Sequence, residues 1–145
     1  MQSYYVDTCI YINLWKKEVD ETGKPLWLLA KKFFEFADQN NLKIFYSGFI
    51  LKEFLFLLSA EEYLNKREFI EYNPLFEKTI LTKEEYKEAT KLKNKLNTDC
   101  SLYDLIHLRL TKKTNSILIT QDRELLELAN FMDIPAKTPQ EIISY

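Results

Sequence analysis

The sequence of 145 residues is poor in cysteine, glycine and proline, with two, two and four residues of each. Cys9 and Cys100 form no CxxC pair and no metal-ligand spacing, which excludes a disulfide framework and a zinc site of the usual kind. So few glycines and prolines exclude collagen-like and low-complexity chains. Because 46% of the residues are hydrophobic, the chain is able to bury a sizeable core, and its length predicts a single domain over residues 1–145.

Long apolar runs are also missing. The best candidate, Phe49–Leu58, is ten residues long and includes Lys52 and Glu53, whereas a membrane-spanning helix needs about 20 apolar residues. The first three residues carry no basic side chain, and Asp7 interrupts the apolar run that follows, so no signal peptide is predicted. We therefore expect a cytoplasmic protein with reduced thiols and no membrane contact.

A strong charge of one sign is absent as well. Twenty Lys and Arg residues oppose 22 Asp and Glu residues, for a net charge of −2. Local basic clusters occur at Lys16-Lys17, Lys31-Lys32 and Lys112-Lys113, although most clusters of this kind are solvated helix faces. The composition therefore permits a nucleic-acid partner without requiring one.

What the sequence does contain is an alternation of short apolar segments with longer helical patterns. β-Strands are predicted at residues 4–6, 42–46, 76–81, 116–120 and 134–137. Strands that alternate with helices of ten or more residues are typical of a parallel sheet covered on both faces. The sequence therefore predicts an α/β fold with three layers, α/β/α, around a central parallel sheet of four to five short strands.

The helical segments carry clear start and stop signals. Capping boxes begin at Ser59, Thr82 and Ser101, and Asn115 is expected in the left-handed conformation after the last of these helices. A helix from residue 48 to 58 is apolar on nearly every side, which predicts burial on both faces. Further helices are expected over residues 26–40 and 123–131 and from residue 139, and residues 10–15 fit either a helix or a longer strand.

Four acidic residues fall at the carboxyl edge of the predicted sheet. Asp7 ends the first strand, and Asp122 follows the fourth. The helix that begins at Asp104 covers about 16 Å, and the strand that follows it returns by about 17 Å, so Asp104 comes back to the height of Asp122. Glu53 is the only acid in the apolar helix after the second strand. This edge is where open α/β sheets bind their ligands.

Simpler explanations exist for each acid taken alone. Asp104 is also the last residue of a capping box, and Asp122 is a suitable N-cap for the helix that follows it. Glu53 would be explained by an ion pair with a lysine. Asp7 has no such explanation, because an unpaired acid inside an apolar segment is costly.

Together the four carboxylates predict a cation site. At an effective dielectric constant near 20, two like charges at about 4 Å repel by roughly 4 kcal/mol, which a cation or shared protons would offset. Mg²⁺ and Mn²⁺ prefer oxygen ligands, including water and substrate phosphates. Such ions activate water and stabilise the charge of a phosphoryl transition state. The pattern therefore indicates phosphodiester hydrolysis without a catalytic histidine or a nucleophilic serine.

The remaining candidate groups receive lesser roles. His107 is the only histidine, and we expect it on the helix surface or partly buried, neither a ligand nor a base. Cys9 and Cys100 are interpreted as small buried hydrophobic residues. Of the other acids, Glu124 is the best candidate for an outer metal ligand or for a group that contacts the ligands.

Five segments resemble the PIN-domain family of metal-dependent ribonucleases, in particular its small VapC-like toxins, and they extend over essentially the whole chain. They are Val6-Asp7-Thr8, Phe49-Ile-Leu-Lys-Glu53-Phe, Leu102-Tyr-Asp104-Leu-Ile-His-Leu, Ile117-Leu-Ile-Thr120-Gln-Asp122 and Ile134-Pro-Ala-Lys-Thr-Pro139-Gln-Glu. No single segment is diagnostic, but their order and spacing are fairly specific.

The resemblance implies a Mg²⁺- or Mn²⁺-dependent endoribonuclease, a small antitoxin protein as partner, and a homodimer. The expected catalytic and metal-binding residues are Asp7, Glu53, Asp104 and Asp122. Supporting groups would be Thr8, Thr120 and Glu124, and contacts to the RNA backbone would come from Lys16, Arg109 and Arg123. Three alternatives stay open: a stand-alone PIN-like nuclease without an antitoxin, a phosphatase or DNA nuclease with a similar carboxylate set, and a non-catalytic module with an acidic pocket.

Overall fold

The computed structural model describes residues 1–143 of the chain. The strands are β1 (Ser3–Val6), β2 (Lys43–Tyr46), β3 (Phe76–Lys78), β4 (Ile117–Ile119) and β5 (Ala136–Lys137). The helices are α1 (Thr8–Trp15), α2 (Leu26–Gln39), α3 (Gly48–Leu57), α4 (Ala60–Tyr72), α5 (Lys83–Lys95), α6 (Leu102–Lys113), α7 (Arg123–Phe131) and α8 (Pro139–Ile143). Within these residues, none of the helices has the length and hydrophobicity needed to cross a bilayer.

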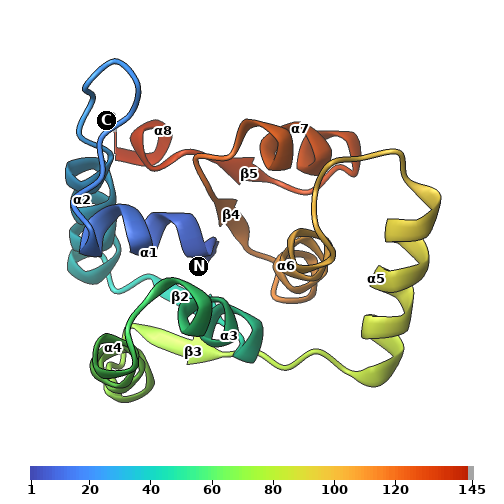
Figure 1. Cartoon of the computed structure of the whole chain (residues 1–145), viewed down its shortest axis with the longest axis horizontal. Coiled ribbons are helices and arrows are strands. Elements are labelled where there is room, and N and C mark those ends of the chain that lie inside the picture. Colours follow the sequence, from blue (N-terminus) through green and yellow to red (C-terminus); the bar gives the residue numbers. More distant parts are fainter. Residues whose placement is uncertain (144–145) are drawn as a thin grey trace.

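The five strands form one parallel sheet in the order β3-β2-β1-β4-β5. Helices α1 and α2 lie on one side of it, and α6 lies on the other with α5 packed against its outer face (Figure 1). Tyr4, Tyr5 and Val6 of β1 are all buried, because the central strand of a parallel sheet is covered on both faces. The predicted three-layer α/β fold is confirmed.

The order of the strands creates a point of divergence beside β1. The chain runs from β1 through β2 to β3 toward one edge, then crosses to β4 and β5 on the other side of β1. Ligands of open α/β sheets bind outside the carboxyl ends of the strands at such a switch point. The residues that follow β1 and β4 therefore occupy the position where a functional site is expected.

Aromatic side chains form much of the core between the sheet and α1, α2 and α3. The ring of Tyr11 lies 5.3–5.5 Å, between centroids, from the rings of Trp15, Phe34 and Phe54. Aromatic pairs at this separation are stabilising beyond the area they bury. This cluster joins three helices to each other and fixes the start of α1, which carries the first residues of the site.

Several local predictions are confirmed. Capping boxes form at Ser59, Thr82 and Ser101, and Asn115 adopts a left-handed φ of 53°. The ambiguous residues 10–15 belong to a helix, α1. The strands of the second half are shorter than predicted because the ladder pairs only three residues of β4 and two of β5, and β3 ends at Lys78.

The prediction that α3 is buried on both faces is wrong for its last turn. Ile50 and Phe54 are fully buried, but Leu55, Phe56 and Leu57 are 53%, 75% and 44% exposed. The first two turns of α3 pack on the core, whereas the last turn extends past it toward α4. An apolar helix end therefore stands at the surface.

Candidate functional site

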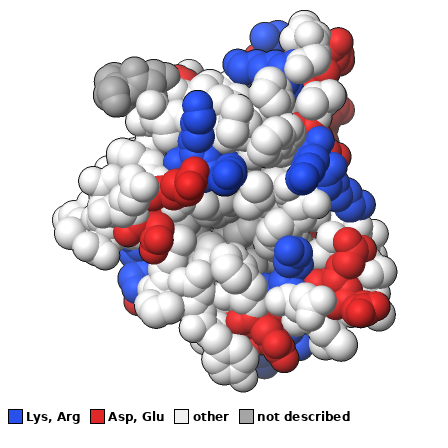
Figure 2. Space-filling view, turned by 90° about the vertical axis from the view of Figure 1, so that its left-hand side faces the viewer, with Lys and Arg blue, Asp and Glu red and all other residues white. Residues whose placement is uncertain are grey.

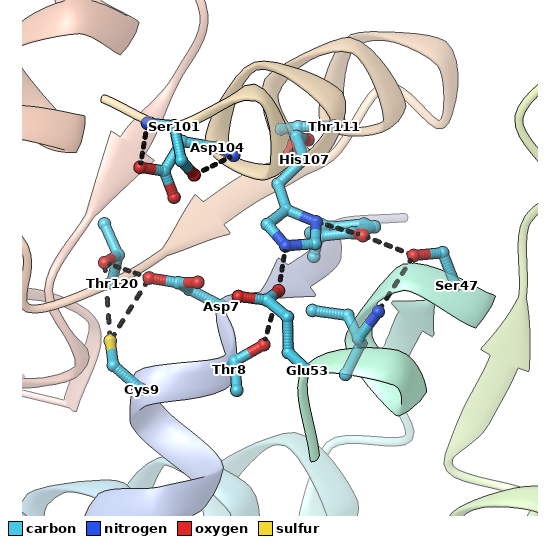
Figure 3. A network of polar contacts seen from close by, with 12 residues as sticks. Asp7, Thr8, Cys9, Ser47, Glu53, Ser101, Asp104, His107, Thr111 and Thr120 are labelled. Carbon is cyan, nitrogen blue, oxygen red and sulfur yellow. Dashed lines mark hydrogen bonds and ion pairs between the residues drawn. The ribbon is translucent and has the colours of Figure 1, made fainter. Parts of the chain in front are cut away.

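Asp7 follows the central strand directly. Its backbone N–H donates to the carbonyl of Ile119 at 2.9 Å, which continues the pairing of β1 with β4 and brings Asp7 beside Thr120. Asp7 Oδ2 accepts hydrogen bonds from Thr120 Oγ1 at 2.7 Å and from Cys9 Sγ at 3.2 Å (Figure 3). Burial raises the pKa of Asp7, and the neighbouring Glu53 raises it further, although His107 and the two hydrogen bonds act in the opposite direction. Ionised Asp7 is therefore unfavourable in this buried position unless a cation lies nearby.

The Cys9 contact changes its interpretation. Cys9 is partly buried and packs against the core, as expected of a small hydrophobic residue, but its thiol also lies 3.6 Å from Thr120 Oγ1 and donates a hydrogen bond to Asp7. Burial and the charge of Asp7 raise the pKa of Cys9 well above its usual range. The thiol is therefore a donor that orients Asp7, and its raised pKa disfavours the nucleophilic thiolate.

Glu53 reaches the same edge from the second turn of α3. Its Oε1 accepts hydrogen bonds from Thr8 Oγ1 at 2.9 Å and from His107 Nε2 at 2.5 Å. The prediction that His107 lies at the surface or is partly buried is wrong, because its side chain is fully buried. A single histidine on an apolar helix face gives no sequence signal for this contact, since its partner lies 54 residues away.

Asp104 and Asp122 each combine a helix cap with a place at the site. Asp104 Oδ2 accepts from the backbone N–H of Ser101 at 3.1 Å, as the capping box predicts. Asp122 Oδ1 accepts from the backbone N–H groups of Glu124 and Leu125 at 3.0 and 3.3 Å. The capping interpretation is therefore right for both residues, and it does not exclude the functional one.

Each of the four carboxylates uses one oxygen for its hydrogen bonds with the described part of the chain. Oδ2 of Asp7, Oε1 of Glu53, Oδ2 of Asp104 and Oδ1 of Asp122 accept the hydrogen bonds described above. The second oxygen of each accepts no hydrogen bond from residues 1–143. Burial raises the pKa of Asp104, and the charges of Asp7 and Asp122 add to the rise. The carboxylates are thus oriented by one oxygen and able to bind a ligand with the other.

The four acids line one cleft of about 300 Å³ together with Thr8, Cys9, Ile12, Leu57 and Glu18. Glu18 is a fifth acid that the sequence interpretation missed. It follows Lys17, whose left-handed φ of 51° turns the chain after α1, and its Oε1 accepts a hydrogen bond from Asn13 at 2.9 Å. Nothing in the spacing of Glu18 indicates this turn, because a lysine rarely adopts a positive φ.

Some of the residues predicted to support the site or to contact RNA lie at the acidic cleft, and others do not. Glu124 lines a separate hollow of about 550 Å³ with Asp99 and Glu127, not the acidic cleft. Lys16 Nζ donates to the carbonyl of Leu57 at 2.8 Å, which places it at the rim of the cleft. Arg123 is exposed and follows Asp122 directly.

Arg109 lies elsewhere. Its guanidinium forms ion pairs with Glu85 at 3.4 Å and Glu88 at 3.3 Å on α5. It is not among the residues that line the acidic cleft. Arg109 therefore pairs with acidic residues of α5 and does not lie at the acidic cleft, where its predicted contact with RNA would require it.

The donor set of the cleft fits a hydrated divalent cation. Its ligands would be hard carboxylate oxygens, which Mg²⁺ and Mn²⁺ prefer. Among residues 1–143, no three Asp, Glu, His or Cys side chains lie close enough to hold one ion directly. Mg²⁺ is usually bound through one or two carboxylates and several waters, so this spacing suits an ion that keeps part of its hydration shell.

The sequence comparison identifies the family of this chain, and the comparison with solved structures agrees on its fold. The family model of the PIN domain matches residues 4–130, so the chain belongs to the PIN-domain family, whose members are generally nucleases that use divalent metals. Among solved structures, the chain is similar to FitAcB from Neisseria gonorrhoeae, with a TM-score of 0.62 and 14% identity over 94% of this chain and 97% of that one. Comparison with curated proteins gives no match.

Proposed function

We propose that the protein is a divalent-metal-dependent endoribonuclease that hydrolyses RNA phosphodiester bonds, and that residues 1–145 act as one PIN-like domain in the cytoplasm. The observation that carries the proposal is the set of four carboxylates at the switch point of the sheet, each with one oxygen not engaged by the described residues. The cleft contains no serine, and its one thiol is held by Asp7 in a protonated form. This donor set favours hydrolysis by water over a covalent intermediate on the protein.

Each carboxylate has a defined part in this chemistry. Mg²⁺ or Mn²⁺ in the cleft would activate water and balance the negative charge that develops at phosphorus. Asp7 and Asp104 would hold the ion, and Glu53 and Asp122 would orient it or its waters. Thr120 and Thr8 fix the carboxylates of Asp7 and Glu53 by hydrogen bonds, so little reorganisation is needed when substrate binds.

The proposal is tested by cleavage of a labelled single-stranded RNA in Mn²⁺, with and without EDTA. Chelation and Asp104→Asn are each expected to abolish cleavage, because both remove charge that the transition state needs. Asp99→Asn is the matched control, since Asp99 lines the neighbouring hollow. Cleavage that survives both EDTA and Asp104→Asn excludes the mechanism. Parallel assays on duplex DNA and a phosphomonoester separate the DNA-nuclease and phosphatase alternatives.

We assign contacts to the RNA backbone to Lys16 and Arg123 rather than to Arg109, whose charge is already neutralised on α5. Lys16→Ala is expected to raise KM and to reduce the slope of log KM against log salt by about 1, as for the loss of one phosphate contact. The measurement is RNA cleavage over a range of KCl concentrations. Lys43→Ala is the control, because Lys43 begins β2 at the opposite edge of the sheet. An unchanged slope for Lys16→Ala contradicts the assignment.

We also propose that the exposed apolar residues of α3 and α4 form a protein interface, the α3–α4 surface. It consists of Leu55, Phe56, Leu57, Leu64, Phe69 and Tyr72, which are 44–83% exposed. These residues lie on two helices that contact each other, and large apolar side chains at the surface are candidates for an interaction site. Charges of both signs are scattered between uncharged areas on the side of the molecule that carries α1, α2 and α4 (Figure 2).

A second copy of the chain is the first expected occupant of the α3–α4 surface. Phe56→Ser is expected to convert a dimer into a monomer in size-exclusion chromatography with light scattering. Phe131→Ser is the matched control, because Phe131 is 74% exposed on α7. A wild-type monomer, or an equal effect of both variants, contradicts the dimer proposal.

The antitoxin proposal rests on the resemblance to VapC-like toxins and on the position of Leu57. Leu57 belongs both to the α3–α4 surface and to the acidic cleft. A partner bound there would be able to place a basic side chain among the carboxylates. The test is whether the product of the neighbouring reading frame, if it has a basic tail, binds the protein and inhibits RNA cleavage. Without binding, the protein is a stand-alone nuclease.

A further inference from the structure

A chain of buried polar side chains runs from Glu53 into the core behind the cleft (Figure 3). His107 Nε2 contacts Glu53 Oε1 at 2.5 Å, and His107 Nδ1 lies 2.7 Å from the hydroxyl of Tyr5. The Tyr5 hydroxyl lies 2.8 Å from Ser47 Oγ, which accepts from the backbone N–H of Ile50 at 3.4 Å. Tyr5 and His107 are completely buried and Ser47 is 1% exposed. The chain therefore joins the cleft to β1 and to the start of α3 without contact with water.

With a neutral imidazole, the donors and acceptors give this chain one consistent direction. The ionised carboxylate of Glu53 only accepts, so His107 Nε2 must carry a hydrogen and donate it. A neutral imidazole then has Nδ1 free to accept, and the Tyr5 O–H donates to it. Ser47 accepts from Ile50 and donates to Tyr5, so every hydrogen in the chain has an acceptor.

We propose that His107 is a positioning residue that holds Glu53 in the orientation required for metal binding, and that Tyr5 and Ser47 hold His107 as its Nε2–H tautomer. The inference rests on the proposed function in one respect only, that Glu53 is part of a metal site. Glutamate has a long, flexible side chain, and ordering it costs conformational entropy. Thr8 and His107 both donate to Oε1 and so restrict the Glu53 side chain before an ion arrives. Because the carboxylate is planar, fixing Oε1 also restricts the position of Oε2.

A purely structural role explains the chain less well. His107 is completely buried in a helix whose neighbouring residues Ile106 and Leu108 are also fully buried, so nothing about burial alone requires a polar side chain at this position. A leucine in place of His107 would occupy this position without the need to satisfy two ring nitrogens, and buried polar groups are costly unless all are paired. The paired imidazole ends on the one oxygen of Glu53 that also binds Thr8. The geometry thus points to the carboxylate as the group that the chain serves.

The first experiment reads the tautomer directly and needs neither metal nor RNA. Because the protein has a single histidine, a long-range ¹H–¹⁵N spectrum of the imidazole shows one set of signals. Metal-free wild type is expected to show the Nε2–H tautomer, with Nδ1 unprotonated. Tyr5→Phe is expected to give a mixture of tautomers. A wild-type spectrum with the hydrogen on Nδ1, or the same spectrum in both proteins, overturns the assigned chain.

The second experiment measures Mn²⁺ binding by calorimetry in the absence of RNA. His107→Leu is expected to weaken Mn²⁺ binding about 10- to 100-fold, as for the loss of other groups that orient metal ligands. His107→Gln, whose side-chain amide is able to donate to Glu53, is expected to recover a large part of the loss. In a Glu53→Gln background, His107→Leu is expected to change Mn²⁺ affinity by less than about twofold, because the group that it positions is already altered.

The outcomes separate the two proposals. If wild type binds Mn²⁺ and His107→Leu weakens binding only in the presence of Glu53, positioning is supported even if no RNA substrate is cleaved. If His107→Leu folds and binds Mn²⁺ as tightly as wild type, the positioning role is wrong while the nuclease proposal stands. If the loss is equal in both backgrounds, His107 acts on the fold as a whole and the positioning role is again wrong. If His107→Leu does not fold, Tyr5→Phe takes its place and is expected to weaken binding about 3- to 10-fold.

Discussion

Asp7→Asn is expected to lower the rate of RNA cleavage by about a thousandfold, which corresponds to a loss of about 4 kcal/mol of transition-state stabilisation. Asp7 is the most buried of the four carboxylates, at 6% exposure, and charge interactions are strongest where water is excluded. The asparagine side chain keeps an oxygen that is able to accept from Thr120. The expected loss is therefore one of charge at an otherwise similar side chain. The measurement is single-turnover cleavage in Mn²⁺.

The same substitution is expected to stabilise the metal-free protein. Burial raises the pKa of Asp7 in the folded state, so its ionisation destabilises the fold as the pH rises above the pKa of the unfolded chain, and the effect is fully present above the folded pKa. In EDTA at pH 7, Asp7→Asn should have the higher Tm, and Mn²⁺ should raise the Tm of wild type alone. Asp38→Asn is the control, because Asp38 is exposed at the end of α2 and lines a hollow away from the cleft. If Asp7→Asn raises the Tm but wild type cleaves nothing, the protein is a binding module.

The second large effect is expected far from the cleft, at Glu85→Gln. Glu85 Oε1 accepts from Lys113 Nζ at 2.8 Å and from the backbone N–H of Thr82 at 2.9 Å, and Oε2 lies 3.4 Å from Arg109. Burial acts against its ionisation, but these donors prevail and lower the pKa of Glu85 from 4.5 to about 2. This difference corresponds to about 3 kcal/mol of folding stability at pH 7. Because glutamine preserves the capping hydrogen bond, the substitution removes mainly the charge.

The pH dependence gives this prediction its sign. A carboxylate whose pKa is lowered by folding stabilises the protein above its unfolded pKa, and the stabilisation is lost as the pH falls through the folded value. The free energies of unfolding of wild type and Glu85→Gln, measured in urea, should differ by about 3 kcal/mol at pH 7 and converge between about pH 4.5 and 2. Glu88→Gln is the matched control; Glu88 is 62% exposed, so its loss should cost less than about 1 kcal/mol. A difference that stays constant down to pH 2.5 would show that the charge is not the cause.

The sequence predicts the fold and the four cleft acids because their signals are local. Asp7 and Asp122 are marked by the strands that precede them, and the capping box at Ser101 marks the start of α6 and so the height of Asp104. In each case, the rule that the carboxyl ends of parallel strands share an edge converts a local signal into a position in space.

The features that the sequence interpretation missed depend on contacts between distant segments. The burial of His107 is decided by Glu53 and Tyr5, which are 54 and 102 residues away. Glu18 reaches the cleft because Lys17 adopts a positive φ, and without a glycine at this position the sequence gives no signal for such a turn. The exposed end of α3 is as apolar as its buried start. Hydrophobic periodicity does not show where the core ends, so the sequence gives no signal for this change.

The double use of Asp104 and Asp122 has a consequence for any mutational survey of this protein. Alanine at Asp122 would take away the acceptor for the first amides of α7, at a cost of about 1 kcal/mol, and alanine at Asp104 would open the capping box of α6. The loss of activity in an alanine variant could then come either from a frayed helix start or from the missing carboxylate. Asparagine, itself a good first-turn acceptor, keeps both helix starts intact, so only an amide scan at these positions reports on the reaction.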